Sequence, residues 1–242
     1  MKEAIDLVMS ARALCEEIHT RLSAQAGSVN FPAIVAFNQC HQHATVCLEL
    51  LCFYQSVWSK AQVNYGVLTV QQVLSVQQQK QENGERVMKA ARILLIECLS
   101  SMEYCAKEAR NGRELLLPCG KNLRVHLSNI LRLSPASSPS VKRWISDEDA
   151  RLWTGAIGLR NSLVHNNGIA DEDEDFVYPD CILQMRRGQM TRGDLLLVFR
   201  ICIWVVNAFE RWCLEFLNRL ARPGESTAAS ASSESAIKGT LS

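Results

Sequence analysis

Apolar residues recur every three to four positions along nearly the whole chain, and few prolines interrupt these periodic stretches. This spacing places apolar side chains on one face of an α-helix, whereas a half-buried strand requires strict alternation. The pattern predicts an all-α protein, folded as an up-and-down bundle of several helices. We expect residues 1–221 to form one domain. Residues 222–242, dominated by Ser, Ala and Gly, are predicted to be a disordered tail.

Breaks in the periodicity delimit the helices of the first half of the chain. The predicted helical segments are 3–25, a segment starting near Phe31-Pro32, 67–82, 85–110 and 115–133. Gly27 ends the first, and Asn83-Gly84 predicts a turn between the third and the fourth. The segment from Ser134 to Ser140 contains two prolines among small polar residues and is predicted to be a loop.

The second half of the chain is predicted to contain two further helices separated by an insertion. Ser146, followed by three acids, has the character of an N-cap, and its helix is expected to reach about Asn166. Residues 176–189 have the character of a short hairpin with a turn at Arg187-Gly188. Asp194 is predicted to cap the last helix.

Arg160 falls within an apolar arc of the predicted helix 146–166. Trp153, Ile157 and Val164 lie seven, three and four residues from it, so they share its side of an ideal helix. A buried guanidinium without partners is costly, because it loses its hydration. Arg160 must therefore meet a carboxylate of its own chain, a partner chain or a ligand phosphate. The first of these would be an ordinary internal ion pair.

Asn161 and His165 are four residues apart and share a different face of this helix. His165 lies in the last turn, where unpaired carbonyls favour the imidazolium form. A histidine that exchanges protons near neutral pH, an orienting amide and a flanking arginine together suit phosphodiester chemistry. Arg160 and His165 point about 140° apart on an ideal helix. Their side chains can therefore meet only if the arginine side chain bends, if the last helical turn is distorted, or if two chains each contribute one of them. The alternative is a solvated histidine bonded to a carbonyl.

The run from Arg160-Asn161 to His165, followed by Asn166-Asn167-Gly168, resembles the signature of the HEPN superfamily of helical domains. That signature is Arg, four to six residues and then His, often with a polar residue directly after the Arg. The match covers about residues 146–221, including the hairpin-like insertion. Arg12 and His19 also satisfy the spacing but lack the following Asn and the terminating turn, so we interpret that match as accidental.

The resemblance implies a metal-independent endoribonuclease that acts as a homodimer, with the motifs of two subunits facing each other across a cleft. It implies that Arg160 stabilises the charge on the scissile phosphate, that His165 handles protons and that Asn161 orients one or both. RNA is the expected substrate. Because the family includes toxins, an antitoxin or regulatory protein is a further expected partner. Some members have lost cleavage, so the alternative is a non-catalytic module that binds a nucleotide or a protein.

Three arginines near the insertion, Arg186, Arg187 and Arg192, are predicted to contact RNA phosphates. They would offset the repulsion between RNA and the preceding acidic run Asp171–Asp175. The alternative is that they are surface charges on a turn. The acidic run itself either recruits a divalent ion or, as we favour, forms a solvated loop.

Composition limits the other kinds of chemistry. The 26 basic and 25 acidic residues nearly cancel, so any polyanion must be bound locally. Cys40, His43 and Cys47 lie near one helical face and form the best candidate metal site. No paired CxxC accompanies them, and small core residues are the favoured interpretation. Motifs of dinucleotide, triphosphate, zinc-protease and serine-hydrolase sites are missing from the sequence. We therefore expect no metal and no cofactor.

Cysteine usage and hydropathy suggest the cellular setting. The ten cysteines follow no repeating spacing, which favours reduced thiols and a cytoplasmic location. Acids occur near the N-terminus where a secretory peptide would be apolar. The most apolar run, Leu195–Val206, is too short for a bilayer and contains Arg200, so no membrane segment is expected.

Overall fold

A computed structural model describes residues 1–26, 32–62, 70–111, 147–191, 194 and 196–220. The elements in chain order are α1 (Lys2–Ala26), α2 (Pro32–Gln62), α3 (Val70–Asn111), α5 (Asp147–His165), β1 (Glu174–Tyr178), β2 (Cys181–Met185) and α6 (Leu197–Leu220). Helices dominate the described residues, and the two strands form a single antiparallel hairpin between α5 and α6. The all-α bundle with a short hairpin-like insertion is thus confirmed. No helix within the described ranges is long and apolar enough to cross a bilayer.

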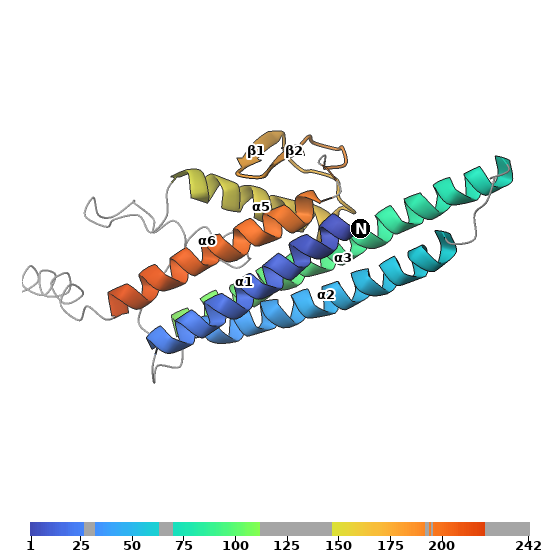
Figure 1. The fold of residues 1–242 in the computed structure, drawn as a ribbon. Coiled ribbons are helices and arrows are strands. Elements are labelled where there is room, and N and C mark those ends of the chain that lie inside the picture. The colour runs from blue at the N-terminus through green and yellow to red at the C-terminus, as the bar shows by residue number, and fades with distance from the viewer. Residues whose placement is uncertain (27–31, 63–69, 112–146, 192–193, 195, 221–242) are drawn as a thin grey trace, which may run out of the picture.

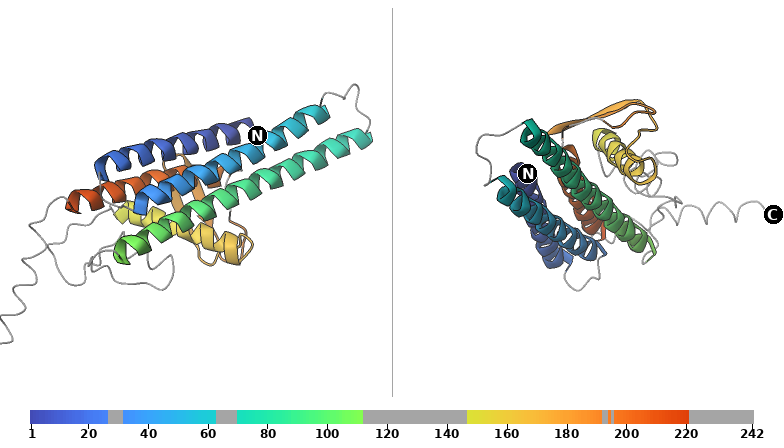
Figure 2. Two further views of the ribbon diagram at one scale, coloured as in Figure 1. Left: turned by 90° about the horizontal axis from the view of Figure 1, so that it is seen from below. Right: turned by 90° about the vertical axis from the view of Figure 1, so that its right-hand side faces the viewer.

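The helices alternate in direction, as an up-and-down bundle requires. α1, α3 and α6 run one way, whereas α2 and α5 run the other way (Figure 1). α5 packs against α3 and α6, on the opposite side of the bundle from α1, and β1 covers part of its outer surface (Figure 2). The end of α2 and the start of α3 extend together beyond the other helices (Figure 1).

Aromatic side chains join α5 and the hairpin to α6. Trp153 and Trp204 meet edge to face with their ring centroids 5.6 Å apart. Tyr178 of β1 contacts Trp204 in the same manner, and its hydroxyl donates a 2.7 Å hydrogen bond to the carbonyl oxygen of Leu152. A buried tyrosine needs such a polar partner for its hydroxyl. These contacts fix the position of α5, which carries the Arg–His motif.

The turn predicted at Asn83-Gly84 is wrong, because α3 is continuous from Val70 to Asn111. Nothing lies within 4 Å of the position that a Cβ on Gly84 would take, so this glycine costs only helix propensity of about 1 kcal/mol. Side-chain pairs four residues apart support the helix across it. One of them is the 3.3 Å hydrogen bond from Gln81 Nε2 to Glu85 Oε1.

The hairpin turn predicted at Arg187-Gly188 is also wrong. Tyr178 pairs with Cys181, so the strands are joined at Pro179-Asp180. Gly188, with φ of 74°, forms a second turn after β2. Both positions have turn-forming residues, and the buried, alternating side chains of the two strands decide which one closes the hairpin.

Asp194 caps the last helix, as predicted. Its Oδ1 accepts a 2.8 Å hydrogen bond from the backbone N of Leu196, and its carbonyl oxygen accepts a 3.1 Å bond from the N of Leu197. Five other predictions lie outside the described residues: the helix 115–133, the loop 134–140, the Ser146 cap, the placement of Arg192 and the tail 222–242.

Buried thiols line the centre of the bundle. Desolvation raises the pKa of Cys15 and Cys213 and raises the pKa of Cys47 to about 12, from an ordinary value of 9.0. Above pH 9 the unfolded chain releases thiol protons that the folded protein retains. Stability that is fully present below pH 9 is therefore lost as the pH rises towards these raised values.

We expect the free energy of unfolding to fall above pH 9, by about 1.4 kcal/mol per pH unit for each such thiol. Urea unfolding at pH 7, 9 and 10.5 in the presence of a reductant measures this dependence. Cys47→Ala removes one contributing thiol, so its stability should decline less steeply than that of the wild type. Identical slopes for the two proteins would contradict the assignment to Cys47.

Candidate functional site

Packing on two sides of α5 sets the position of the Arg–His motif. The bundle contacts the helix on one side, and the hairpin contacts it on the other. On the inner side, Trp153 and Ile157 are almost fully buried. On the outer side, a Cβ at Gly155 would lie only 2.5 Å from Cγ of Phe176, so β1 approaches the helix backbone directly. Only glycine permits such a close approach. The position of the motif is thereby fixed by the bundle on one side and the hairpin on the other.

Arg160 is half-buried and has no acidic partner among the described residues. Its Nη1 donates a 3.1 Å hydrogen bond to Oδ1 of Asn161, and its Nε is buried without an acceptor. The apolar arc predicted around it holds for Trp153 and Ile157, while Val164 is 42% exposed. The described residues therefore do not supply the internal ion pair that was the alternative for Arg160.

His165 is the last residue of α5, and its side chain is exposed. Within the described ranges it has neither the carbonyl partner of the alternative interpretation nor a hydrogen bond to Arg160 or Asn161. The structure thus joins Arg160 and Asn161 directly and leaves His165 exposed at the end of the helix. An imidazole in this position can meet a ligand or a second subunit without losing an existing contact.

The chain turns sharply after His165. Asn167 and Gly168 have positive φ values of 51° and 88°, a conformation that asparagine and glycine adopt most readily. The carbonyl oxygen of the buried Ser162 accepts hydrogen bonds from the backbone N of Asn166 at 3.0 Å and of Gly168 at 2.8 Å. These bonds satisfy a helix-end carbonyl and direct the chain back along the outside of α5 towards β1.

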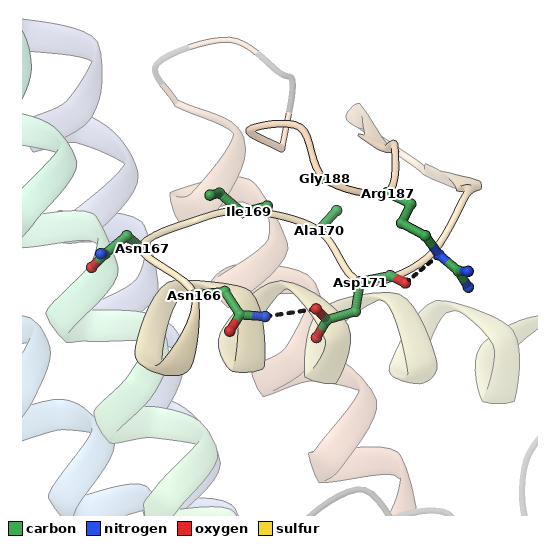
Figure 3. A pocket seen from close by; sticks show the side chains of 7 residues that line it. All are labelled: Asn166, Asn167, Ile169, Ala170, Asp171, Arg187 and Gly188. Atoms are coloured by element: carbon green, nitrogen blue, oxygen red, sulfur yellow. Dashed lines mark hydrogen bonds between the residues drawn. The ribbon is translucent and has the colours of Figure 1, made fainter.

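A hollow of about 590 Å³ lies beside this turn (Figure 3). Its lining residues are Asn166, Asn167, Ile169, Ala170, Asp171, Arg187 and Gly188. The two sides are held together by backbone hydrogen bonds of 2.9 Å, from Ala170 N to Gln189 O and from Gly188 N to Ala170 O. Asn166 Nδ2 donates a 2.7 Å hydrogen bond to Oδ1 of Asp171, which joins two of the lining residues (Figure 3).

Arg186 and Arg187, predicted to contact RNA, are bonded to the acidic run. Two nitrogens of Arg186 bond both carboxylate oxygens of Asp175, and these hydrogen bonds lower the pKa of that carboxyl group. The backbone N of Arg187 bonds Asp173, while its Nε bonds the carbonyl oxygen of Asp171, beside the hollow (Figure 3). Asp175 thus pairs with the guanidinium of Arg186, whereas the side chain of Arg187 bonds a carbonyl oxygen. Both arrangements fit surface charges on a turn; the role of the two arginines towards RNA stays a prediction.

Arg92 of α3 lies against the same turn, although no sequence pattern predicted it there. Its Nη2 would be 3.5 Å from a Cβ on Gly168, and its Nε is buried without an acceptor. The residue precedes Ile93 within an amphipathic helix and has no motif around it. Nothing local marks it, because its proximity to the motif arises from the packing of α3 against α5.

The candidate metal site on α2 consists of residues engaged elsewhere. Cys40 and Cys47 are buried, and their thiols bond the carbonyl oxygens of Cys98 and Ala90 on α3. The imidazole Nε2 of His43 lies 3.9 Å from Glu97. The favoured interpretation of the two cysteines as core residues is confirmed. Across the part of the chain that the structure covers, no group of three or more His, Cys, Asp or Glu residues is arranged to hold a metal ion.

Comparison with known proteins gives no match to a family model, to a curated protein or to a solved structure.

Proposed function

We propose that the chain is a metal-independent endoribonuclease of the HEPN type, with Arg160, Asn161 and His165 as its catalytic residues. The observation that carries this proposal is the half-buried guanidinium of Arg160, which has an orphaned Nε and no acid bonded to it in the described structure. Such a group is stabilised when an anion supplies the missing acceptors. The exposed His165 at the end of the same helix adds a side chain that can accept or donate a proton.

The proposed reaction uses the Arg–His motifs of two copies of the chain. The 2′-hydroxyl oxygen of a ribose attacks the adjacent phosphorus, and a neutral imidazole of His165 takes the hydroxyl proton. The bond from phosphorus to the 5′-oxygen breaks, and this oxygen receives a proton from a second, protonated imidazole. Arg160, held by Asn161, stabilises the extra negative charge on the phosphoryl oxygens. The products are a 2′,3′-cyclic phosphate and a 5′-hydroxyl.

A homodimer would supply the second imidazole. The motif of one chain contains a single histidine, whereas the reaction needs a base and an acid at the same phosphate. Arg160 and His165 also point apart along α5, so a site with both groups converging is more readily built from two chains. We therefore propose that two copies place their α5 ends opposite each other.

The test is cleavage of mixed RNA in the presence of EDTA by the wild type and by His165→Ala. The wild type is expected to cleave and to leave cyclic phosphate ends, and the variant is expected to be slower by about 10²- to 10⁴-fold. His19→Ala, in the accidental match on α1, is the matched control and should retain full activity. Equal cleavage by wild type and His165→Ala, or cleavage that EDTA abolishes, contradicts the proposal.

A further inference from the structure

The arginines whose side chains the structure describes fall into two groups according to their partners. One group has carboxylate or carbonyl acceptors and comprises Arg21, Arg86, Arg151, Arg186, Arg187, Arg200 and Arg211. The other group has a buried Nε without an acceptor and comprises Arg12, Arg92 and Arg160. A buried donor without an acceptor is unfavourable, so each arginine of the second group would be stabilised by a ligand that supplies the missing acceptor.

Two of these unpaired arginines belong to the same end of α5. Arg160 lies in the last two turns of the helix, and Arg92 reaches from α3 to the turn at Gly168. Arg12 lies on α1, on the far side of the bundle (Figure 2). Three acids of the insertion have other partners: Asp171 bonds the amide of Asn166, Asp173 bonds the backbone N of Arg187, and Asp175 bonds the guanidinium of Arg186.

We infer that Arg92 binds a backbone phosphate of RNA next to the one that Arg160 contacts. This inference rests on the proposed function and adds to the site a residue from outside the motif. Two uncompensated guanidinium groups suit a ligand with repeated negative charges better than a single carboxylate does, and the planar guanidinium matches phosphate oxygens. Nη2 of Arg92 lies 3.5 Å from the position that a Cβ on Gly168 would take, which is an ordinary contact distance, so its guanidinium lies directly against the turn after the motif.

The experiment measures binding separately from cleavage. A fluorescently labelled single-stranded RNA is titrated with full-length protein carrying His165→Ala, and anisotropy gives the affinity at several salt concentrations. Adding Arg92→Ala is expected to weaken binding about tenfold or more and to reduce the slope of log K against log[salt] by about one. Arg12→Ala, which removes an equally unpaired arginine from α1, should change neither quantity.

Two further variants keep the test decisive. Arg92→Lys retains the charge and should retain the salt slope, and Arg92→Gln carries the same expectation as Arg92→Ala should the alanine variant fail to fold. Unchanged affinity and slope in Arg92→Ala, with weakened binding in Arg160→Ala, would overturn the inference alone. Absence of RNA binding by the His165→Ala parent, together with absence of cleavage by the wild type, would overturn the proposed function as well. If the chain binds a protein and not RNA, the proposed function is overturned in the same way.

Discussion

Replacing Arg160 with leucine is expected to stabilise the protein and at the same time to abolish RNA cleavage. Arg160 shares a helix face with the buried Trp153 and Ile157, and its Nε is buried without an acceptor. Leucine fills much of the same space without this penalty, so the free energy of unfolding should rise by about 1–3 kcal/mol. Cleavage should fall by about 10²- to 10³-fold, because the growing phosphate charge loses its donor. Urea unfolding and single-turnover cleavage measure the two effects.

Arg151→Leu provides the matched control on the same helix. Arg151 bonds Oε1 of Glu174 at 2.9 Å as well as the carbonyl oxygen of Asp175, so its replacement removes favourable contacts. Its exposed ion pair is worth less than about 1 kcal/mol, and the control should be slightly destabilised or neutral. A loss of stability in Arg160→Leu would show that the guanidinium has a stabilising partner beyond Asn161, and would remove the main support for the catalytic interpretation.

Light scattering on Arg160→Leu separates the proposed nuclease from the non-catalytic alternative. A catalytic Arg160 can be lost without dissociating the dimer. If Arg160 instead anchors an interface, Arg160→Leu should convert a dimer into monomers, since arginines at interface centres carry much of the binding energy. Dissociation of the dimer without any cleavage by the wild type would favour the interaction module.

Gly155→Ala is expected to destabilise the protein by about 1–3 kcal/mol, although alanine is the better helix former. The new Cβ would lie 2.5–2.9 Å from three atoms of the Phe176 ring, which is fully buried and cannot swing aside. Either β1 or α5 must shift. Because the segment after β2 pairs with the turn that follows His165, this shift should also slow RNA cleavage. Thermal unfolding and cleavage rates measure the effects.

Gly158→Ala is the control for this prediction. Its Cβ would meet the far ends of two flexible side chains, Glu172 Oε1 at 3.3 Å and Met185 Cε at 3.4 Å. These atoms can move, so the variant should be neutral or gain up to about 1 kcal/mol from helix propensity. If Gly155→Ala and Gly158→Ala are equally stable, the hairpin does not lie as close to α5 as the structure places it.

Features that depend on residues a few positions apart follow from the amino-acid sequence alone. The three-to-four-residue spacing predicted the all-α bundle, and Asp194 predicted the start of α6, because helix periodicity and capping are local effects. The spacing from Trp153 to Arg160 likewise predicted an arginine beside apolar side chains, since rotation about one helix axis sets which residues share a face.

Features that depend on distant segments emerge only from the packing of the whole chain. Asn83-Gly84 and Arg187-Gly188 both have turn composition, yet one lies within α3 and the other follows the hairpin. Packing and strand pairing override such weak local preferences. The same holds for the candidate site. The contact of Arg92 with the turn at Gly168 joins residues 76 positions apart in the sequence, and local patterns carry no information about contacts between helices.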